Sequence, residues 1–365
     1  MKQFKITFSV TFILYVFLQV EVVNACTAFC LVNNDHYVLV GKNLDWPVGD
    51  GFILINPRGI SKTALTISGE KPARWVSKYG SITFNQFGKE LPLGGMNETG
   101  LVVEELSYSP SVYPEVDSLF SVNELQWIQY QLDNYSSVDE VIKNLEKINI
   151  SRMLFGLHYF VCDRFGQAAI IEFINGRILV YSGKKLPVPV LANNSYENSI
   201  RYLKLRKKSN SKKIPANSTE SPERFYKTVI MLQKYSTYQN SSPVEYALKI
   251  LQNVKQQDTQ WSILYNPSSL TIKYSTLWNP VICDIQLKNI DFSANKSKYF
   301  PLSNKKNNRV IIGEDFYDDS PENQTMLIEE VLNKYIQFKV INKKSAGMLG
   351  KKVIKYQRNV NFKGA

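Results

Sequence analysis

The junction Val23-Asn24-Ala25-Cys26 constrains this chain most, because it predicts where the folded protein begins. A positively charged start is followed by an uncharged apolar stretch, residues 6–20, and by a short exit ending in a small residue, the layout of a secretory signal peptide. The apolar stretch is shorter than the roughly 20 residues of a transmembrane helix. We therefore expect residues 1–25 to be removed and the mature protein to be exported, either to the periplasm or into the medium.

A cysteine at a new N-terminus carries a nucleophile and a base on one residue. An α-amine titrates near ~7.7 to 8.0 and a thiol near ~8.5, so the amine can take the thiol proton near neutral pH without a histidine. The chain has only two histidines: His36 follows a turn signal, and His158 lies in an apolar run typical of the core. An alternative is a lipoprotein signal, in which Cys26 is lipidated and its amine is blocked.

The composition is that of a globular protein, with 44% hydrophobic and 21% charged residues. The net charge of +12 is concentrated in two basic runs, residues 201–213 and 339–363. We interpret the first as a solvated helix end and the second as a mobile tail, with contact to an anionic membrane as the alternative. Neither run interleaves aromatic residues as a stacking surface would, so we expect no nucleic-acid partner.

The four cysteines do not have the spacing of a metal site or of a disulfide framework. With two histidines as well, the sequence predicts no metal and no other cofactor.

Blocks of predicted strands alternate with blocks of predicted helices. Helix starts are marked by Ser137 and Ser242, each with a glutamate three residues later, the pattern of a capping box. The blocks lack a regular βαβ rhythm, which favours an α+β fold with antiparallel sheets. We expect one domain over residues 26–336 and a basic tail over 337–365. The predicted strands are 27–32, 37–40, 52–56, 75–85, 101–106, 158–162, 168–173, 177–181, 261–265 and 270–274, and the predicted helices are 122–132, 138–146, 322–337 and two that begin at Pro222 and Pro243.

Five short motifs occur in an order that resembles the choloylglycine hydrolase family. This family belongs to the N-terminal-nucleophile hydrolases and includes penicillin V acylases and conjugated bile salt hydrolases. The resemblance covers roughly residues 26–287 and implies a four-layer αββα sandwich with two antiparallel sheets. The motifs are Cys26-Thr27-Ala28, Gly41-Lys42-Asn43-Leu44-Asp45-Trp46, Gly95-Met96-Asn97-Glu98-Thr99-Gly100-Leu101, Leu191-Ala192-Asn193-Asn194 and Ser221-Pro222-Glu223-Arg224-Phe225.

The resemblance implies a role for four of these residues. Cys26 is the nucleophile, and Asp45 holds its α-ammonium. Asn193 supplies part of the oxyanion hole, and Arg224 contacts the thiolate site. From the residues alone, Asp45 is better explained as a turn residue, Asn193 could be a turn residue or a glycosylation site, and Arg224 could be a surface cation.

Two positions depart from the family pattern. Lys42 stands where many members have arginine; it keeps the positive charge but lacks the planar fork of a guanidinium. Ser107 and Tyr108 follow the third motif where bile salt hydrolases carry an asparagine and some penicillin acylases a tyrosine, which weakens a bile-salt assignment. We expect Trp46, Ser107 and Tyr108 to bind substrate. Trp46 and Tyr108, with Phe52 and Trp75 further off, could wall an apolar acyl pocket or belong to the core.

The resemblance implies an enzyme that hydrolyses linear, non-peptide amides through a Cys26 thioester. We expect a small-molecule substrate with an apolar or aromatic acyl part, such as a penicillin V or an N-acyl amide; conjugated bile salts are the alternative. A different alternative is an exported lipoprotein or binding protein with this fold and no turnover. By resemblance, the protein forms a homo-oligomer.

Overall fold

The structure is a computed structural model that describes residues 26–33, 37–67, 69–115, 120–209, 220–235, 242–303 and 310–359. The expected leader and His36 lie outside these residues, as does part of the first basic run. Within them, no helix is long and apolar enough to cross a membrane.

Two large sheets dominate the described chain. The first has seven strands in the order β14-β1-β2-β15-β16-β17-β19. All of its pairs are antiparallel except β17 with β19. Its strands are β14 (Val190–Leu191), β1 (Thr27–Val32), β2 (Val38–Asp45), β15 (Thr259–Asn266), β16 (Thr271–Thr276), β17 (Cys283–Gln286) and β19 (Val310–Ile311).

The second sheet has nine strands, and all of its pairs are antiparallel. In spatial order they are β13 (Arg177–Ser182), β12 (Ala168–Ile174), β11 (Leu157–Cys162), β8 (Val102–Ser107), β7 (Pro92–Asn97), β6 (Ser81–Asn85), β3 (Phe52–Asn56), β18 (Lys298–Pro301) and β20 (Tyr317–Asp318). Two short pairs stand apart, β4 (Ser61–Thr63) with β5 (Arg74–Val76) and β9 (Ser121–Asn123) with β10 (Asn149–Ser151).

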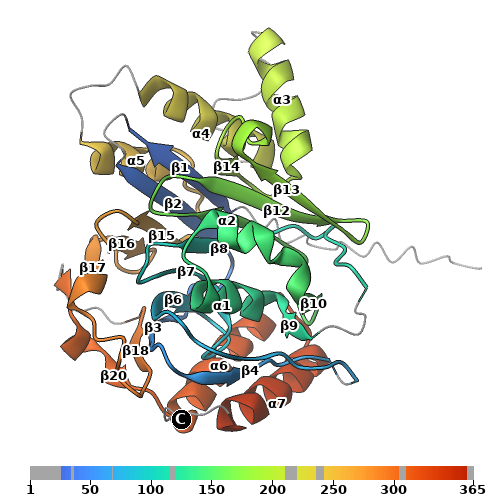
Figure 1. Cartoon of the computed structure of the whole chain (residues 1–365), viewed down its shortest axis with the longest axis vertical. Helices are drawn as coiled ribbons and strands as arrows, with labels where there is room; N and C mark the ends of the chain where they lie inside the picture. The colour runs from blue at the N-terminus through green and yellow to red at the C-terminus, as the bar shows by residue number, and fades with distance from the viewer. Residues whose placement is uncertain are drawn as a thin grey trace, which may run out of the picture.

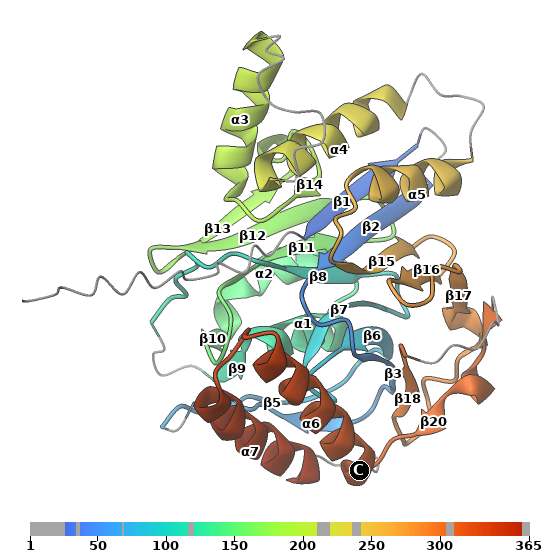
Figure 2. The same cartoon turned by 180° about the vertical axis from the view of Figure 1, so that it is seen from behind.

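Helices cover the outer faces of both sheets, so the molecule has four layers (Figures 1 and 2). On the seven-stranded sheet lie α4 (Ser221–Tyr235) and α5 (Pro243–Asn253), with α3 (Tyr196–Ser209) packed on α4. On the nine-stranded sheet α1 (Glu124–Asn134) packs against β7 and β8, with the short α2 (Val138–Lys143) following it. This arrangement is the αββα sandwich that the resemblance implied.

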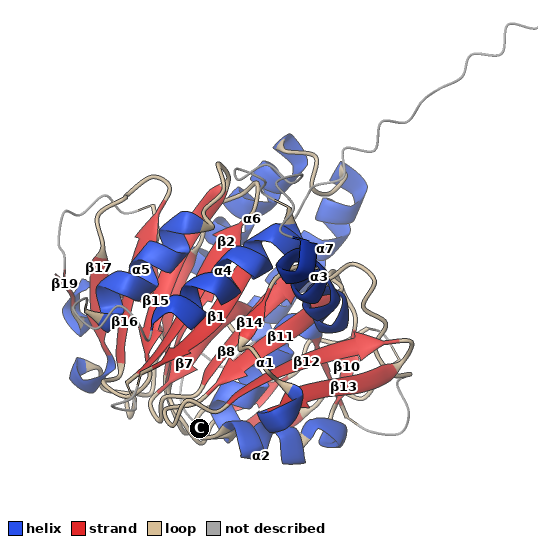
Figure 3. Ribbon diagram, turned by 90° about the horizontal axis from the view of Figure 1, so that it is seen from above, coloured by secondary structure: helices blue, strands red, loops and turns tan. Residues whose placement is uncertain are grey.

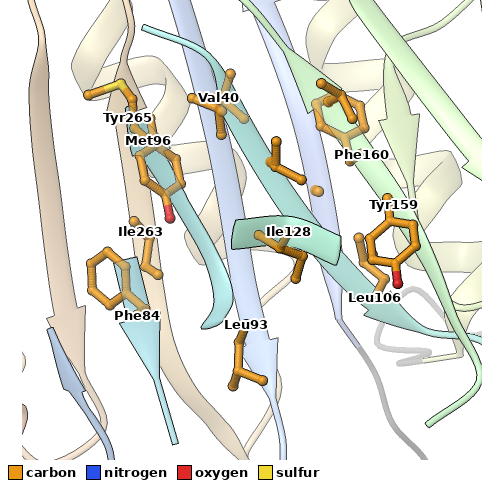
Figure 4. Packing of buried hydrophobic residues seen from close by; sticks show 14 of the residues in the cluster. Val40, Phe84, Leu93, Met96, Leu106, Ile128, Tyr159, Phe160, Ile263 and Tyr265 are labelled. Carbon is orange, nitrogen blue, oxygen red and sulfur yellow. The ribbon is translucent and has the colours of Figure 1, made fainter. Parts of the chain in front are cut away.

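The apolar core lies between the two sheets. Figure 4 shows side chains of both sheets meeting there, among them Ile263 and Tyr265 of β15 and Phe84 of β6. The rings of Phe84 and Tyr265 meet edge to face with centroids 6.4 Å apart. β2 is buried along its whole length because it lies inside the sheet, between the core and α5. Figure 3 views the layers from above.

The predicted helix starts are right in part. Ser137 caps α2 by accepting a hydrogen bond from the amide of Glu140, as the sequence predicts. Ser242 precedes α5 but makes no side-chain cap, so the second capping box is wrong. Residues 121–123, which the periodicity assigns in part to a helix, instead form β9, and Asn123 caps α1.

The expected mobile tail is wrong for most of its length. Residues 343–359 form the helix α7 (Lys343–Asn359), which packs beside α6 (Pro321–Gln337), as Figure 2 shows. Leu349 and Val353 of α7 are buried in the same apolar cluster as the sheets. The basic residues of α7 are mostly exposed, so the run is basic because one face of an amphipathic helix is basic.

Candidate active site

Cys26 directly precedes β1 and is almost entirely buried, with 2% of its surface exposed. The backbone amide of Asp45, at the end of the neighbouring strand β2, donates a hydrogen bond to the Cys26 thiol. Burial raises the pKa of this thiol to about 12; Lys42 opposes the shift, and Glu105 and Asp45 add to it. A thiol in this setting needs a base that accepts its proton during attack.

Arg224 is the cation that contacts the backbone of Cys26 directly. It lies in the first turn of α4 and is buried, with 1% of its surface exposed. Its guanidinium donates to the carbonyl oxygen of Cys26 at 3.3 Å and to the hydroxyl of Thr27 at 3.2 Å. Burial lowers the pKa of Arg224, while Asp45 and Cys26 favour its charged form. The interpretation as a surface cation is therefore wrong.

Asn193 follows β14, the strand next to β1. Its Oδ1 accepts a hydrogen bond from Arg224 at 2.8 Å, and its Nδ2 donates to the carbonyl oxygen of Ser107 at 2.9 Å. These contacts place Asn193 between the seven-stranded sheet and the end of β8. One N–H of the amide is used by Ser107, which leaves the other N–H of Nδ2 for a further acceptor.

Asp45 is fully buried at the end of β2. The hydroxyl of Thr259 donates to its Oδ1, and its Oδ2 has no hydrogen bond within the described residues. Burial raises the pKa of Asp45 to about 7, although the Thr259 hydrogen bond and the charge of Arg224 oppose the shift. A buried carboxylate oxygen without a donor next to Cys26 suits an ammonium group.

Lys42 is buried between two consecutive glutamates of β8. Its Nζ lies 3.4 Å from Glu104 Oε2 and 3.9 Å from Glu105 Oε1, and it also donates to the backbone oxygen of Glu105. Burial disfavours the ammonium, but Glu105, Cys26 and Glu104 outweigh it and raise the pKa of Lys42. Lys42 therefore acts on the Cys26 thiol as part of a charge cluster rather than as a single cation.

The Glu104 side chain is positioned by a hydrogen bond from the opposite sheet and by close packing against a glycine. Tyr265 of β15 donates a hydrogen bond to Glu104 Oε1. Burial raises the pKa of Glu104 to about 7, against the effects of Lys42 and Tyr265. A Cβ on Gly94 would lie 2.2 Å from Glu104 Oε2, so a larger residue at this position of β7 would displace the Glu104 carboxylate from its place beside Lys42.

An apolar pocket opens beside Cys26. The empty space in the pocket and at its mouth is about 360 Å³, of which the centre of a water-sized sphere can reach about 20 Å³, so the cavity itself is narrow. Four aromatic rings of its wall contact one another in a closed circuit, Trp46 with Phe155, Phe155 with Phe87, Phe87 with Tyr335 and Tyr335 with Trp46, at centroid distances of 5.3 to 6.1 Å. The remaining lining residues are Leu44, Gln86, Leu93, Glu105, Ser107, Leu125 and Leu157.

The structure separates the residues that the sequence predicts to bind substrate. Trp46 and Ser107 line the pocket, but Tyr108 does not. Tyr108 follows the end of β8, and its ring stacks on His158 at a centroid distance of 5.1 Å. Phe52 and Trp75 lie elsewhere in the core, so neither of them walls this pocket.

His158 is not near the thiol in any described contact. Its Nδ1 lies 3.1 Å from Glu172 Oε1, and its ring is fully buried. This agrees with the core histidine expected from the sequence. Among the described residues, no group of three or more His, Cys, Asp or Glu side chains could hold a metal ion.

Sequence reasoning missed Glu104, Glu105 and three of the four rings that wall the pocket, Phe87, Phe155 and Tyr335. Glu104 and Glu105 lie in a predicted strand as two consecutive acids in a buried segment, a signal that could have suggested a buried counter-charge. Tyr335 comes from α6, and the sequence offers no sign that its hydroxyl would accept a hydrogen bond from Trp46 Nε1, at 2.8 Å.

The model of the family of linear amide C–N hydrolases, choloylglycine hydrolase family, matches residues 26–279. The chain therefore belongs to this family and is a linear amide C–N hydrolase, as the five motifs predict. This places it with enzymes rather than with binding proteins that have no turnover.

Two relatives have different substrates in their names. A penicillin V acylase of Pectobacterium atrosepticum is 26% identical over 314 residues, covering 74% of this chain and 82% of that protein. A bile salt hydrolase/transferase of Lactiplantibacillus plantarum is 28% identical over 181 residues, covering 46% of this chain and 52% of that protein.

Solved structures confirm the fold. The penicillin V acylase from Agrobacterium tumefaciens superposes with a TM-score of 0.70 at 22% identity, covering 81% of this chain and 98% of its own. A mutant conjugated bile acid hydrolase from Clostridium perfringens gives a TM-score of 0.65 at 18% identity, covering 79% of this chain and 99% of its own. The expected N-terminal-nucleophile hydrolase fold is thereby confirmed.

Proposed function

We propose that this amide hydrolase is exported, that its mature N-terminus is Cys26, and that it cleaves amides whose acyl part is apolar or aromatic. The observation that carries the substrate class is the circuit of four aromatic rings beside Cys26. A wall of this kind excludes water and gains free energy from an apolar acyl group.

The nucleophile is supported by two independent observations. The family match begins at Cys26, the residue that follows the predicted cleavage site. Cys26 also lines the pocket, and its thiol accepts the amide hydrogen bond of Asp45. A free α-amine at Cys26 would lie on the same residue as the thiol and would be the base that its raised pKa requires.

The reaction then proceeds in two steps. In the first, Cys26 Sγ attacks the amide carbon while its α-amine takes the thiol proton, and Asn193 Nδ2 donates to the developing oxyanion. The C–N bond breaks, and the α-ammonium gives its proton to the departing amine. In the second step the α-amine takes a proton from water as the water oxygen attacks the thioester. The C–S bond then breaks, the acid is released, and the α-ammonium returns its proton to Cys26 Sγ. Asp45 Oδ2 holds the ammonium between these transfers.

The apolar, ring-lined wall of the pocket favours an acyl group made of a single ring or a short apolar chain. The penicillin V acylase of Pectobacterium atrosepticum also matches 74% of this chain, against 46% for the bile salt hydrolase/transferase. We therefore place penicillin V and N-acyl amides first. Conjugated bile salts are the second candidate, supported by the resemblance to the Lactiplantibacillus plantarum protein.

A substrate panel tests this proposal. The purified mature protein is assayed with penicillin V, an N-acyl homoserine lactone and a glycine-conjugated bile salt. We expect the first two to be cleaved with kcat/KM at least about tenfold above the bile salt, since a poorly fitting acyl group loses ~1.4 kcal/mol or more. We expect Trp46→Ala to lose most of that preference and Trp75→Ala, a matched change away from the pocket, to keep it. Cleavage of the bile salt alone would favour the second candidate.

Export is tested separately from substrate choice. The full chain is expressed in a bacterium with an outer membrane, and the periplasmic fraction is sequenced from its N-terminus. We expect Cys26 as the first residue with an unmodified amine. A lipidated Cys26 in the membrane fraction would instead support the lipoprotein alternative.

A further inference from the structure

Two cysteines outside the active site face each other across the two sheets. Cys30 lies on β1 of the seven-stranded sheet and Cys162 on β11 of the nine-stranded sheet, with their sulfur atoms 3.3 Å apart. Both are buried, with 2% and 0% of their surfaces exposed. Strands β1 and β11 contact each other across the two sheets, and Figure 2 shows them close together.

The surroundings of this pair allow a bond between the two sulfurs. A disulfide has an S–S distance of about 2.05 Å, so the sulfurs need to approach by about 1.2 Å. Both cysteines sit in intact ladders, Cys30 opposite Val40 and Cys162 opposite Val102 and Ala168. In our proposal, rotation of the two side chains supplies this approach and these backbone pairings are kept.

The two other cysteines are engaged elsewhere. Cys26 lines the substrate pocket, and the thiol of Cys283 lies 3.8 Å from the carbonyl oxygen of Val281 on the far side of the seven-stranded sheet. A bond between Cys30 and Cys162 would therefore consume two thiols that are not needed for catalysis and leave Cys26 free.

We propose that Cys30 and Cys162 form a disulfide when the chain folds under oxidising conditions, and that this bond joins the two sheets next to the active site. The oxidant is a low-molecular-weight disulfide such as oxidised glutathione. One protein thiolate attacks it, releases one thiol and forms a mixed disulfide. The second protein thiolate displaces the other thiol, so that two protons and two electrons pass to the oxidant.

Burial sets the time at which the bond forms. The pKa of the Cys162 thiol is raised well above its ordinary value by burial and by the neighbouring Cys30. Thiolate is the reactive form, so exchange is slow once the sheets have closed over the pair. The disulfide forms during folding, and the folded protein keeps whichever redox state it acquired.

The disulfide would stabilise the sandwich because it would close a long loop of the unfolded chain. Cys30 and Cys162 are 132 residues apart in sequence, and a cross-link over such a distance restricts the unfolded chain strongly. Cys30 also lies on the same strand that Cys26 precedes, so the cross-link anchors β1 to the opposite sheet near the nucleophile.

A thiol count tests the proposal directly. The full chain is reduced, unfolded and refolded in a mixture of reduced and oxidised glutathione, and its free cysteines are alkylated in denaturant. We expect two alkylated cysteines, Cys26 and Cys283, and a linked peptide pair whose fragmentation places the bond between Cys30 and Cys162. Four alkylated cysteines, or a bond through Cys26 or Cys283, would overturn the proposal.

Variants and melting curves provide the controls. Cys283→Ser removes a buried cysteine outside the pair and should keep the linked peptides, whereas Cys30→Ala should lose them. Wild-type protein refolded with oxidised glutathione should melt about 5 °C above protein refolded under reduction. This comparison needs no variant, so it holds even where a substitution prevents folding. Equal melting temperatures would overturn the stabilising role.

Discussion

Arg224 and Asn193 are joined by a hydrogen bond of 2.8 Å that determines which end of the asparagine amide is the donor. The guanidinium can only donate, so the atom that it contacts must be Oδ1, and Nδ2 points toward the end of β8. The same guanidinium contacts the carbonyl oxygen of Cys26. One side chain of α4 thus orients both the predicted oxyanion donor and the backbone of the predicted nucleophile.

We predict that Asn193→Ala lowers kcat by about 10²- to 10³-fold with little change in KM, because the lost donor acts on the transition state. Single-turnover and steady-state rates on one acyl amide measure both quantities. Asn194→Ala is the matched control and should keep most of the wild-type rate. A wild-type kcat in Asn193→Ala would remove this residue from the oxyanion hole.

The charge cluster around Lys42 predicts opposite pH shifts. Lys42 lowers the pKa of Cys26, so Lys42→Met should raise it and move the acid limb of thioester formation to higher pH. Glu105 raises that pKa, so Glu105→Gln should lower it and move the limb to lower pH. Lys42→Arg keeps the charge and should leave the limb close to that of the wild type.

Glu104→Gln provides the control for this pair of shifts. Glu104 contacts Lys42 but is absent from the pocket wall, so its loss should move the limb less than the loss of Glu105. Rates of thioester formation are compared from about pH 5 to about pH 11, a range that extends toward the raised pKa of the Cys26 thiol, with circular dichroism to verify folding. Superimposable curves for Lys42→Met, Glu105→Gln and the wild type would separate the cluster from the nucleophile.

Because α7 packs into the core, truncating one of its buried side chains should lower the stability of the protein. The same change in a mobile tail would have no effect. Leu349 of α7 is buried, whereas the adjacent Met348 is 61% exposed. We predict that Leu349→Ala lowers the free energy of unfolding by about 2 to 4 kcal/mol and that Met348→Ala has an effect within about 0.5 kcal/mol. Urea unfolding of both variants measures the difference. Equal midpoints would mean that α7 contributes nothing to the core.

Local patterns in the sequence predict most of the strands that form the site. The hairpin of β15 and β16 follows from two apolar runs around Asn266-Pro267-Ser268-Ser269, a strong turn signal. The sequence does not predict β7, because Pro-Leu-Gly-Gly-Met-Asn is rich in residues that are depleted in strands. The packing of Glu104 against Gly94 explains the first of those glycines, and the sequence alone does not reveal that contact.

The parts of the site that local sequence patterns do not predict depend on contacts between residues far apart in the sequence. The motifs predict Cys26, Lys42, Asp45, Asn193 and Arg224 as site residues, and the structure brings these five side chains together, while their roles stay predictions. The pairing of Lys42 with the acids of β8 depends on β2 and β8 facing each other from different sheets.

The helix α7 shows how composition can mislead. Its basic residues suggest a solvated tail, although Ala346, Leu349 and Val353 have the spacing of an amphipathic helix. The sequence alone does not show that this apolar face has a partner, α6, to pack against. A basic helix of this length gains most of its stability from such packing.

Trapping the acyl-enzyme tests the central claim most directly. The mature protein is mixed with a slowly hydrolysed acyl amide, quenched in acid and digested, and its N-terminal peptide is analysed by mass spectrometry. We predict a peptide that begins at Cys26, carries the acyl mass as a hydroxylamine-labile thioester and has a free α-amine. An active enzyme whose N-terminal peptide begins before Cys26, or whose acyl group is attached to another residue, would contradict the account.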